Sequence, residues 1–196
     1  MTLKEAYRQG RDRLSDAGIP EADLDAWYLL EQVTGISRAR YYADPEREIP
    51  ETDHSRYAAY IERHVPLQHI TGSQEFMGLK FRVNEHVLIP RQDTEILVEE
   101  ALKILREEGL PAQEGKLRVL DLCTGSGCIA RVLAEKTSAA VTAADVSEEA
   151  LIFARDNLAG RSEVVPSDMF SALAGRTYDV IVCNPPYIAT AELPTL

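Results

Sequence analysis

The sequence predicts an α/β protein in which a parallel sheet follows a small helical domain. Apolar residues recur at helical spacing near the N-terminus, apolar runs alternate with helical segments after residue 93, and a glycine-rich turn directly follows one of these runs. Strands that alternate with helices form parallel sheets with right-handed connections. We therefore expect a helical domain over residues 1–73, a β-hairpin connector over 74–92 and a ligand-binding α/β domain over 93–196.

Composition and charge indicate a cytoplasmic globular protein. Hydrophobic residues make up 45% of the chain, and no apolar run approaches the roughly 20 residues that cross a bilayer. The net charge of -11 is spread over the chain, with 9 basic and 13 acidic residues in 1–73 and 12 and 19 in 74–196. Because cationic contacts to phosphate dominate affinity for nucleic acid, we expect no direct nucleic-acid binding. The three cysteines lack zinc spacing, which indicates buried thiols in a reducing compartment.

Three apolar stripes predict the helices of the first domain. Breaks at Gly18-Ile-Pro20 and at residues 44–53, which contain two prolines, separate them. Aromatic residues at such spacing belong to a core more often than to a ligand site, and we interpret them as core. The stripes consist of Leu3, Ala6, Tyr7 and Leu14, then Leu24, Trp27, Leu30 and Val33, then Tyr57, Tyr60, Ile61 and Val65.

The periodicity changes after PLQHITG, residues 66–72, and this change predicts the connector. In EFMGLKFRV, Leu79, Phe81 and Val83 alternate with charged residues, as in a half-buried strand. The run HVLIP, residues 86–90, is short and apolar. We expect a β-hairpin whose second strand is HVLIP.

A capped helix and four strands are predicted in the last domain. Asp93 or Thr94 can N-cap a helix that contains Ile96 and ends at Gly109-Leu-Pro111. The predicted strands cover residues 118–123, 140–145, 163–166 and 178–183.

The stretch DLCTGSGCIA, residues 121–130, predicts a nucleoside cofactor. Gly125 and Gly127 let the backbone approach a ligand closely, and the N-terminus of the following helix offers N–H groups to an anion. Asp145 ends the next strand, where it can accept hydrogen bonds from ribose hydroxyls. The same pattern fits a dinucleotide fingerprint with an acid 20 residues beyond Gly125, so NAD is an alternative. Asp168 is equally well interpreted as an adenine contact or as an exposed loop residue.

The stretch IVCNPPY, residues 181–187, predicts a stiff turn at the end of the fourth strand. Asn184 and the carbonyl of Pro185 offer two acceptors to one planar –NH₂ group, and Tyr187 offers a ring for stacking. Acceptors on the hydrogens of an amide favour lone-pair density on its nitrogen, which suits an in-line methyl displacement. Hydride transfer to NAD does not need acceptors that hold an amide group. The glycine-rich turn and the Asn-Pro-Pro-Tyr turn together therefore favour S-adenosylmethionine over NAD. A rigid proline turn without chemistry is the alternative interpretation.

These motifs also carry a family resemblance that covers nearly the whole chain. PLQHITG, EFMGLKFRVNEHVLIPRQDTE, DLCTGSG and NPPY resemble the protein-(glutamine-N5) methyltransferases that act on peptide chain release factors. NPPY is shared with adenine-N6 and guanine-N2 methyltransferases of nucleic acids, whereas the segment ending in IPRQDTE is far more specific. The resemblance implies a Rossmann-like class I methyltransferase sheet, which in its complete form has a further strand and helix and a closing hairpin beyond NPPY. We therefore expect a fragment that is truncated after the fourth strand, which would be an exposed apolar edge. The resemblance also implies a helical domain that docks the release factor, and methylation of the glutamine in a Gly-Gly-Gln loop that modulates translation termination.

The resemblance implies roles for particular residues. Arg91 falls in the IPR element with no assigned role, and the family usually has glycine where this chain has Cys123. Asn184, Pro185, Pro186 and Tyr187 match the residues that hold the glutamine amide, and we expect Asn184, Pro185 and Tyr187 to be catalytic. Cofactor binding is expected at Cys123, Thr124, Gly125, Ser126, Gly127, Asp145, Asp168, Met169 and Asn184.

Three other functions stay open at this point. A related family methylates a glutamine of a large-subunit ribosomal protein, and its element at residues 93–95 differs. A nucleic-acid methyltransferase would need a basic surface, which the charge balance disfavours. A fragment could also bind its partner without turnover. We expect no metal site, because the four histidines have no ligand spacing. We also expect a monomer.

Overall fold

The computed structural model describes residues 1–63, 66–106 and 115–186. The chain divides into two compact units, Met1–Gly72 and Ser73–Leu196. Each unit has its own core, and the second contains the parallel sheet. No helix among the described residues is long and apolar enough to cross a membrane.

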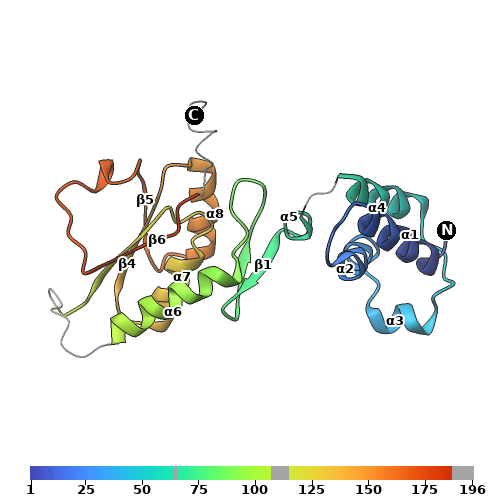
Figure 1. Cartoon of the computed structure of the whole chain (residues 1–196), viewed down its shortest axis with the longest axis horizontal. Helices are drawn as coiled ribbons and strands as arrows, with labels where there is room; N and C mark the ends of the chain where they lie inside the picture. Colours follow the sequence, from blue (N-terminus) through green and yellow to red (C-terminus); the bar gives the residue numbers. More distant parts are fainter. Residues whose placement is uncertain (64–65, 107–114, 187–196) are drawn as a thin grey trace. The chain divides into compact units, whose positions relative to one another are not determined.

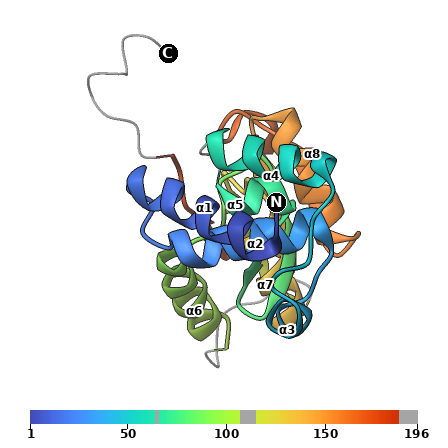
Figure 2. The same cartoon turned by 90° about the vertical axis from the view of Figure 1, so that its right-hand side faces the viewer.

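The first unit is a bundle of helices around an aromatic and aliphatic core (Figures 1 and 2). A capping box starts the first helix, in which Thr2 Oγ1 accepts from the Glu5 N–H at 3.2 Å and a Glu5 carboxylate oxygen accepts from the Thr2 N–H at 2.9 Å. Gly10 makes room for the ring of Tyr57, since a Cβ at residue 10 would lie 1.9 Å from the Tyr57 hydroxyl oxygen. The helices are α1 (Leu3–Asp16), α2 (Ala22–Thr34), α3 (Arg38–Ala43), α4 (Glu51–Arg63) and α5 (Leu67–Thr71).

The predicted stripes supply most of this core. Trp27, Leu30 and Tyr57 are buried, as expected, whereas Leu24 is 38% exposed. Val65 lies outside the described residues. The short helices α3 and α5 were not predicted, because a few residues offer too little periodicity to distinguish a helix from a loop.

The hairpin of the second unit lies earlier in the chain than predicted. Strands β1 (Ser73–Phe76) and β2 (Leu79–Arg82) pair antiparallel across a turn at Met77 and Gly78. Both turn residues have positive φ, 50° and 78°, as a tight two-residue hairpin turn requires. The prediction that HVLIP is the second strand is wrong, since residues 86–90, all of them described, form no strand. Val87 is buried there because it packs against α8 (Glu148–Leu158).

Among the described residues, the sheet contains four parallel strands, as the alternation of strands and helices predicted. Their order across the sheet is β5-β4-β3-β6. The bounds agree with the predicted strands to within two residues: β3 (Arg118–Leu122), β4 (Ala140–Asp145), β5 (Glu163–Pro166) and β6 (Val180–Cys183). Within the described part of the chain, β6 pairs with β3 alone, and Ile181 is exposed on it. This is the apolar edge that the sequence predicts.

Helices α6 (Gln92–Arg106), α7 (Cys128–Lys136) and α8 lie side by side (Figure 1). The connections β3-α7-β4 and β4-α8-β5 step in the same direction along the sheet, so right-handed crossovers carry both helices to the same face. Val119 and Val141 pack in the core with these helices, whereas Leu120 and Leu122 pack with Leu173 of the short 3₁₀ helix η1 (Ser171–Leu173).

Two details of α6 qualify the prediction. Four of the five apolar residues expected on its buried face lie there, since Ala101 and Leu102 are buried and Leu97 and Leu105 pack partly buried against the same core. Ile96 was expected there too, but it is 63% exposed. The predicted end of this helix at Gly109-Leu-Pro111 falls outside the described residues.

Candidate active site

A cavity of about 1210 Å³ opens in the second unit at the carboxyl ends of β3, β4 and β6. Ligands of open α/β sheets bind at this edge, because neighbouring connections diverge there. Five parts of the second unit form the walls: the segment after the hairpin, the first two turns of α6, the residues that end the three strands, the start of α8 and the loop after β5. Among them are Leu88, Arg91, Thr94, Gly125, Asp145 and Asn184.

The glycine-rich turn presents its backbone to this cavity at Gly125. The φ of Gly125 is 54°. A Cβ built there would meet no protein atom within 4 Å, which fits its place in the cavity wall. The Gly125 N–H donates to Asp145 Oδ2 at 2.8 Å, and the Ser147 N–H donates to Asp145 Oδ1 at 3.0 Å. Each carboxylate oxygen therefore has one backbone partner that holds it, and each retains lone-pair capacity for a ligand hydroxyl.

The other glycine of the turn serves packing. A Cβ at Gly127 would lie 3.2 Å from Ala154 Cα on α8, and the φ of Gly127 is 78°. Only glycine combines this φ with so close an approach of helix and loop. Gly127 does not line the cavity, so the two glycines of the turn have different physical tasks.

A buried carboxyl group supports the turn from beneath. Asp121 Oδ2 accepts from the Thr124 hydroxyl at 2.5 Å and from the Ala130 N–H at 3.0 Å, which ties strand, turn and helix together. Burial raises the pKa of Asp121 to about 7, and the nearby Asp145 adds to the rise, while the two hydrogen bonds oppose it. Asp121 Oδ1 is buried and has no hydrogen-bond partner among the described residues, which favours the protonated acid near neutral pH.

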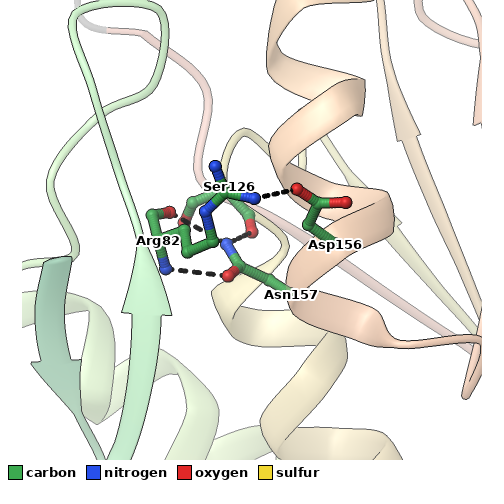
Figure 3. Close-up of polar contacts among 4 residues, drawn as sticks. All are labelled: Arg82, Ser126, Asp156 and Asn157. Atoms are coloured by element: carbon green, nitrogen blue, oxygen red, sulfur yellow. Dashed lines mark hydrogen bonds and ion pairs between the residues drawn. The ribbon is translucent and has the colours of Figure 1, made fainter. Parts of the chain in front are cut away.

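A second residue outside the cavity holds the turn to the hairpin (Figure 3). Asn157 on α8 donates from Nδ2 to the Ser126 carbonyl at 2.8 Å and to the Arg82 carbonyl at 3.0 Å. Its Oδ1 accepts from the Arg82 N–H at 2.8 Å. Figure 3 also shows the ion pair between the Arg82 guanidinium and Asp156.

Asn184 reaches the cavity because β6 pairs with β3, with Cys183 opposite Leu122. Its Nδ2 donates to the hydroxyl oxygen of Thr94 at 3.2 Å, and Thr94 is 7% exposed in the first turn of α6. Pro185 and Pro186 line the same cavity and are exposed. Tyr187, the predicted stacking residue, lies outside the described residues.

Two thiols lie at the ends of β3 and β6 in the cavity wall. Cys123 and Cys183 are partly buried, and only Cys128 among the three cysteines is fully buried as predicted. Cys123 has a φ of 59°, a left-handed conformation that favours glycine. Burial, with Cys183 beside it, raises the pKa of the Cys123 thiol to about 11, which keeps it protonated at neutral pH.

The structure brings part of the predicted set to the cavity. Cys123, Gly125, Asp145, Met169, Asn184, Pro185 and Pro186 line it, together with Arg91. Thr124, Ser126 and Gly127 are buried behind the wall, and Asp168 is exposed outside it. Their predicted contact with a cofactor stays a prediction.

Two functional candidates were missed, Thr94 and Asn157. Thr94 belongs to the DTE element, residues 93–95, where the sequence pattern indicates only a possible helix cap. Its hydrogen bond with Asn184 could not be predicted from the sequence. Asn157 sits in an amphipathic helix where nothing in the periodicity marks a buried amide.

Comparison with known proteins assigns the chain to a family. Sequence profiles of the PrmC N-terminal domain and of the methyltransferase small domain match residues 5–72 and 94–195. A release factor glutamine methyltransferase of Caulobacter vibrioides is 37% identical over 205 residues, which cover 100% of this chain and 69% of that protein. The chain belongs to the release factor glutamine methyltransferase family.

Other relatives agree with this assignment. The release factor glutamine methyltransferase of Koribacter versatilis is 42% identical over 200 residues, covering 98% of this chain and 69% of that protein. Among solved structures, an S-adenosylmethionine-dependent methyltransferase from Agrobacterium tumefaciens is 22% identical with a TM-score of 0.46, covering 58% of this chain and 39% of that chain. A likeness of that size adds no weight, so the assignment to the glutamine methyltransferase family stands on the sequence relatives.

The methyl donor of this methyltransferase family member is S-adenosylmethionine. The residues present fit such a group. Gly125 leaves its side-chain position open toward the cavity, and Asp145 offers acceptors for vicinal hydroxyls. Val146 and Met169 are exposed apolar side chains in the wall, where a flat base can lie against them.

Proposed function

We propose that this chain methylates the side-chain amide nitrogen of the glutamine in the Gly-Gly-Gln loop of peptide chain release factors. The observation that carries the proposal is the shared cavity. Asn184 and Pro185 line the same space as Gly125 and Asp145, so an amide held by the first pair would face a cofactor held by the second. The relatives named release factor glutamine methyltransferase, which match the full length of this chain, support the choice of substrate.

The chemistry asks mainly for positioning. An amide nitrogen is a weak nucleophile because its lone pair is delocalised into the carbonyl. Asn184 Oδ1 and the Pro185 carbonyl would accept hydrogen bonds from the two amide hydrogens of the substrate, which favours lone-pair density on nitrogen and fixes its direction. Orientation of this kind is worth up to roughly 7–11 kcal/mol of the barrier. Tyr187 would stack on the planar amide, and Pro186 would stiffen the turn.

S-adenosylmethionine, when bound, would supply the methyl group as an electrophile. The new bond from the amide nitrogen to the methyl carbon would replace the carbon–sulfur bond, S-adenosylhomocysteine would leave, and one amide proton would pass to water. On the protein side, Asp145 would accept from the ribose hydroxyls, and the backbone at Cys123 and Gly125 would approach the donor closely. Met169 would lie beside the adenine, and Asp168 would reach its amino group. Thr124, Ser126 and Gly127 would act by shaping the turn, and Asn184 would contact both donor and substrate.

The domain roles follow from this proposal. Residues 1–73 would dock the body of the release factor, the hairpin connector within 74–92 would join the parts, and residues 93–196 would bind the donor. The acidic net charge supports a protein partner over direct nucleic-acid binding. We also propose that the chain acts as a monomer in the cytoplasm, where release factors meet ribosomes.

Incubation of a purified release factor with this chain and S-adenosylmethionine tests the proposal, with intact mass as the readout. We expect the release factor to gain the mass of one methyl group in place of a hydrogen, and a variant with alanine for the loop glutamine to gain nothing. Methylation of a large-subunit ribosomal protein instead, or of DNA or RNA, would overturn the choice of substrate. Binding of release factor without any methyl transfer would support the non-catalytic alternative.

A further inference from the structure

We propose that Asn157 is a positioning residue for the cofactor turn, which it holds to strand β2 from outside the cavity. The inference rests on the proposed binding of S-adenosylmethionine at Gly125 and Asp145. Asn157 is absent from the cavity wall and is 7% exposed near the end of α8. Its effect on the cofactor would therefore pass through the backbone that it holds.

The hydrogen bonds of Asn157 determine the orientation of its amide. Both Nδ2 partners, the carbonyls of Ser126 and Arg82, can only accept, and the Oδ1 partner, the Arg82 N–H, can only donate. The amide cannot turn over without setting its oxygen against two carbonyl oxygens. All three bonds are to main-chain atoms, so they fix backbone rather than mobile side chains (Figure 3).

The turn that Asn157 holds needs an external restraint. Ser126 stands between Gly125 and Gly127, and glycines give a chain wide conformational freedom. One side of the turn is held by Asp145 through the Gly125 N–H, and Asn157 holds the carbonyl that follows at Ser126. Within the turn, the Thr124 carbonyl accepts from the Gly127 N–H at 2.9 Å. Loss of the bond at Ser126 would loosen the backbone between these points, including Gly125 where it faces the cavity.

The strand at the other end of this bridge also leads to the cavity. After Arg82 the chain continues through Val83 and Val87, which pack with Ala150 of α8, to the wall residues Leu88 and Arg91. Asn157 thus sets the position of two parts of the wall at once, the glycine turn and the segment after the hairpin. The ion pair between Arg82 and Asp156 lies beside it, but both side chains are largely exposed and contribute little.

Binding of S-adenosylhomocysteine, measured by isothermal titration calorimetry on the full chain, tests the proposal. Asn157→Asp keeps the shape of the side chain but removes both donated hydrogen bonds, and Asn157→Ser removes them without adding charge. We expect the dissociation constant to rise at least about tenfold in both variants, the effect of losing one to two net hydrogen bonds.

Two controls separate positioning from general destabilisation. Arg82→Ala deletes the exposed ion pair in the same place but keeps the main-chain bonds to Asn157. Leu158→Ala empties a fully buried site on α8 and lowers stability without touching the turn. We expect both controls to bind within about twofold of wild type at temperatures where they are folded, because neither changes a bond to Ser126.

The outcomes separate this inference from the proposed function. Wild-type chain that fails to bind S-adenosylhomocysteine would contradict the proposed function. Wild-type binding with unchanged affinity in the Asn157 variants, or equal losses in Leu158→Ala, would overturn the role of Asn157. If neither Asn157 variant folds, amide hydrogen exchange of the wild-type chain tests the role of Asn157 instead. The amides of residues 125–127 and of β2 should then share one opening free energy, and independent opening would overturn the proposal.

Discussion

The side-chain nitrogen of Asn184 donates a hydrogen bond to the Thr94 hydroxyl oxygen at 3.2 Å, joining the end of β6 to the first turn of α6. Both residues line the cavity, and Thr94 is almost fully buried. The bond restricts the rotation of an amide whose oxygen we propose as an acceptor for the substrate. It also links the DTE element, part of the most specific motif of the family resemblance, to the NPPY turn.

Replacement of Thr94 by valine should slow methyl transfer more than it weakens substrate binding. Valine keeps the shape but removes the hydroxyl, so Asn184 would lose the bond that orients it. We expect kcat to fall about tenfold with KM for the release factor nearly unchanged, the pattern of an interaction that matters in the transition state. Thr94→Ser keeps the hydroxyl and should restore most of kcat. Equal losses in both variants would show that packing, rather than the hydroxyl, is what matters.

The two glycines of the cofactor turn should respond differently to alanine. At Gly127 a methyl group would lie 3.2 Å from Ala154 Cα, so Gly127→Ala should lower the unfolding free energy by about 2–4 kcal/mol. At Gly125 a methyl group meets no protein atom within 4 Å, so the cost to folding should be limited to about 1 kcal/mol of φ strain. Gly125→Ala should instead weaken S-adenosylhomocysteine binding, because the methyl group projects into the cavity. Denaturant melts and calorimetry on both variants would measure this, and identical profiles would contradict it.

Asp121 should make the stability of the protein depend on pH. Its pKa is raised to about 7 in the folded chain, whereas an unfolded aspartate titrates near 4. Between about pH 4 and pH 7 the folded chain holds a proton on Asp121 that the unfolded chain has released. The stabilisation that this proton gives the folded chain is therefore fully present below about pH 4. It falls as pH rises toward 7, by up to about 1.4 kcal/mol per unit, and then stays level. Asp121→Asn should remove this slope in urea melts from pH 5 to 8. A slope identical to that of wild type would contradict the protonated acid.

The thiol in the cavity wall should react slowly with alkylating agents. The pKa of Cys123 is raised to about 11, so the thiolate fraction at pH 7.5 is about a hundredfold below that of a free cysteine. Iodoacetamide labelling followed by peptide mass mapping should show slow modification that accelerates with pH. S-adenosylhomocysteine should slow it further, since Cys123 lines the cavity. Fast labelling at neutral pH, indifferent to the ligand, would place the thiol outside the cofactor site.

The strands and their parallel arrangement could be predicted because the signals are local and strong. Buried parallel strands such as β3 and β4 appear as continuous apolar runs, and the glycine turn between β3 and α7 marks where one ends. The hairpin was placed wrongly because HVLIP has the composition of a strand. Its apolar residue Val87 is buried against α8 instead, and no local pattern reveals that partner.

The site was predicted only in part for the same reason. Asp145 and Asn184 could be found because each ends a recognisable strand. Thr94 and Asn157 bond to partners far away in the sequence, Asn184 and Arg82, so the roles that we propose for them depend on tertiary contacts. A threonine in a first helical turn and an asparagine near a helix end are ordinary in isolation.

Tandem mass spectrometry of the release factor peptide that contains Gly-Gly-Gln is the most direct test of the central claim. The peptide would come from reactions with wild-type chain and with Asn184→Ala. The account predicts a methyl group on the side-chain nitrogen of the glutamine with the wild type, and a loss of at least about a hundredfold with the variant. A methyl group at any other atom, or an undiminished rate with Asn184→Ala, would contradict it.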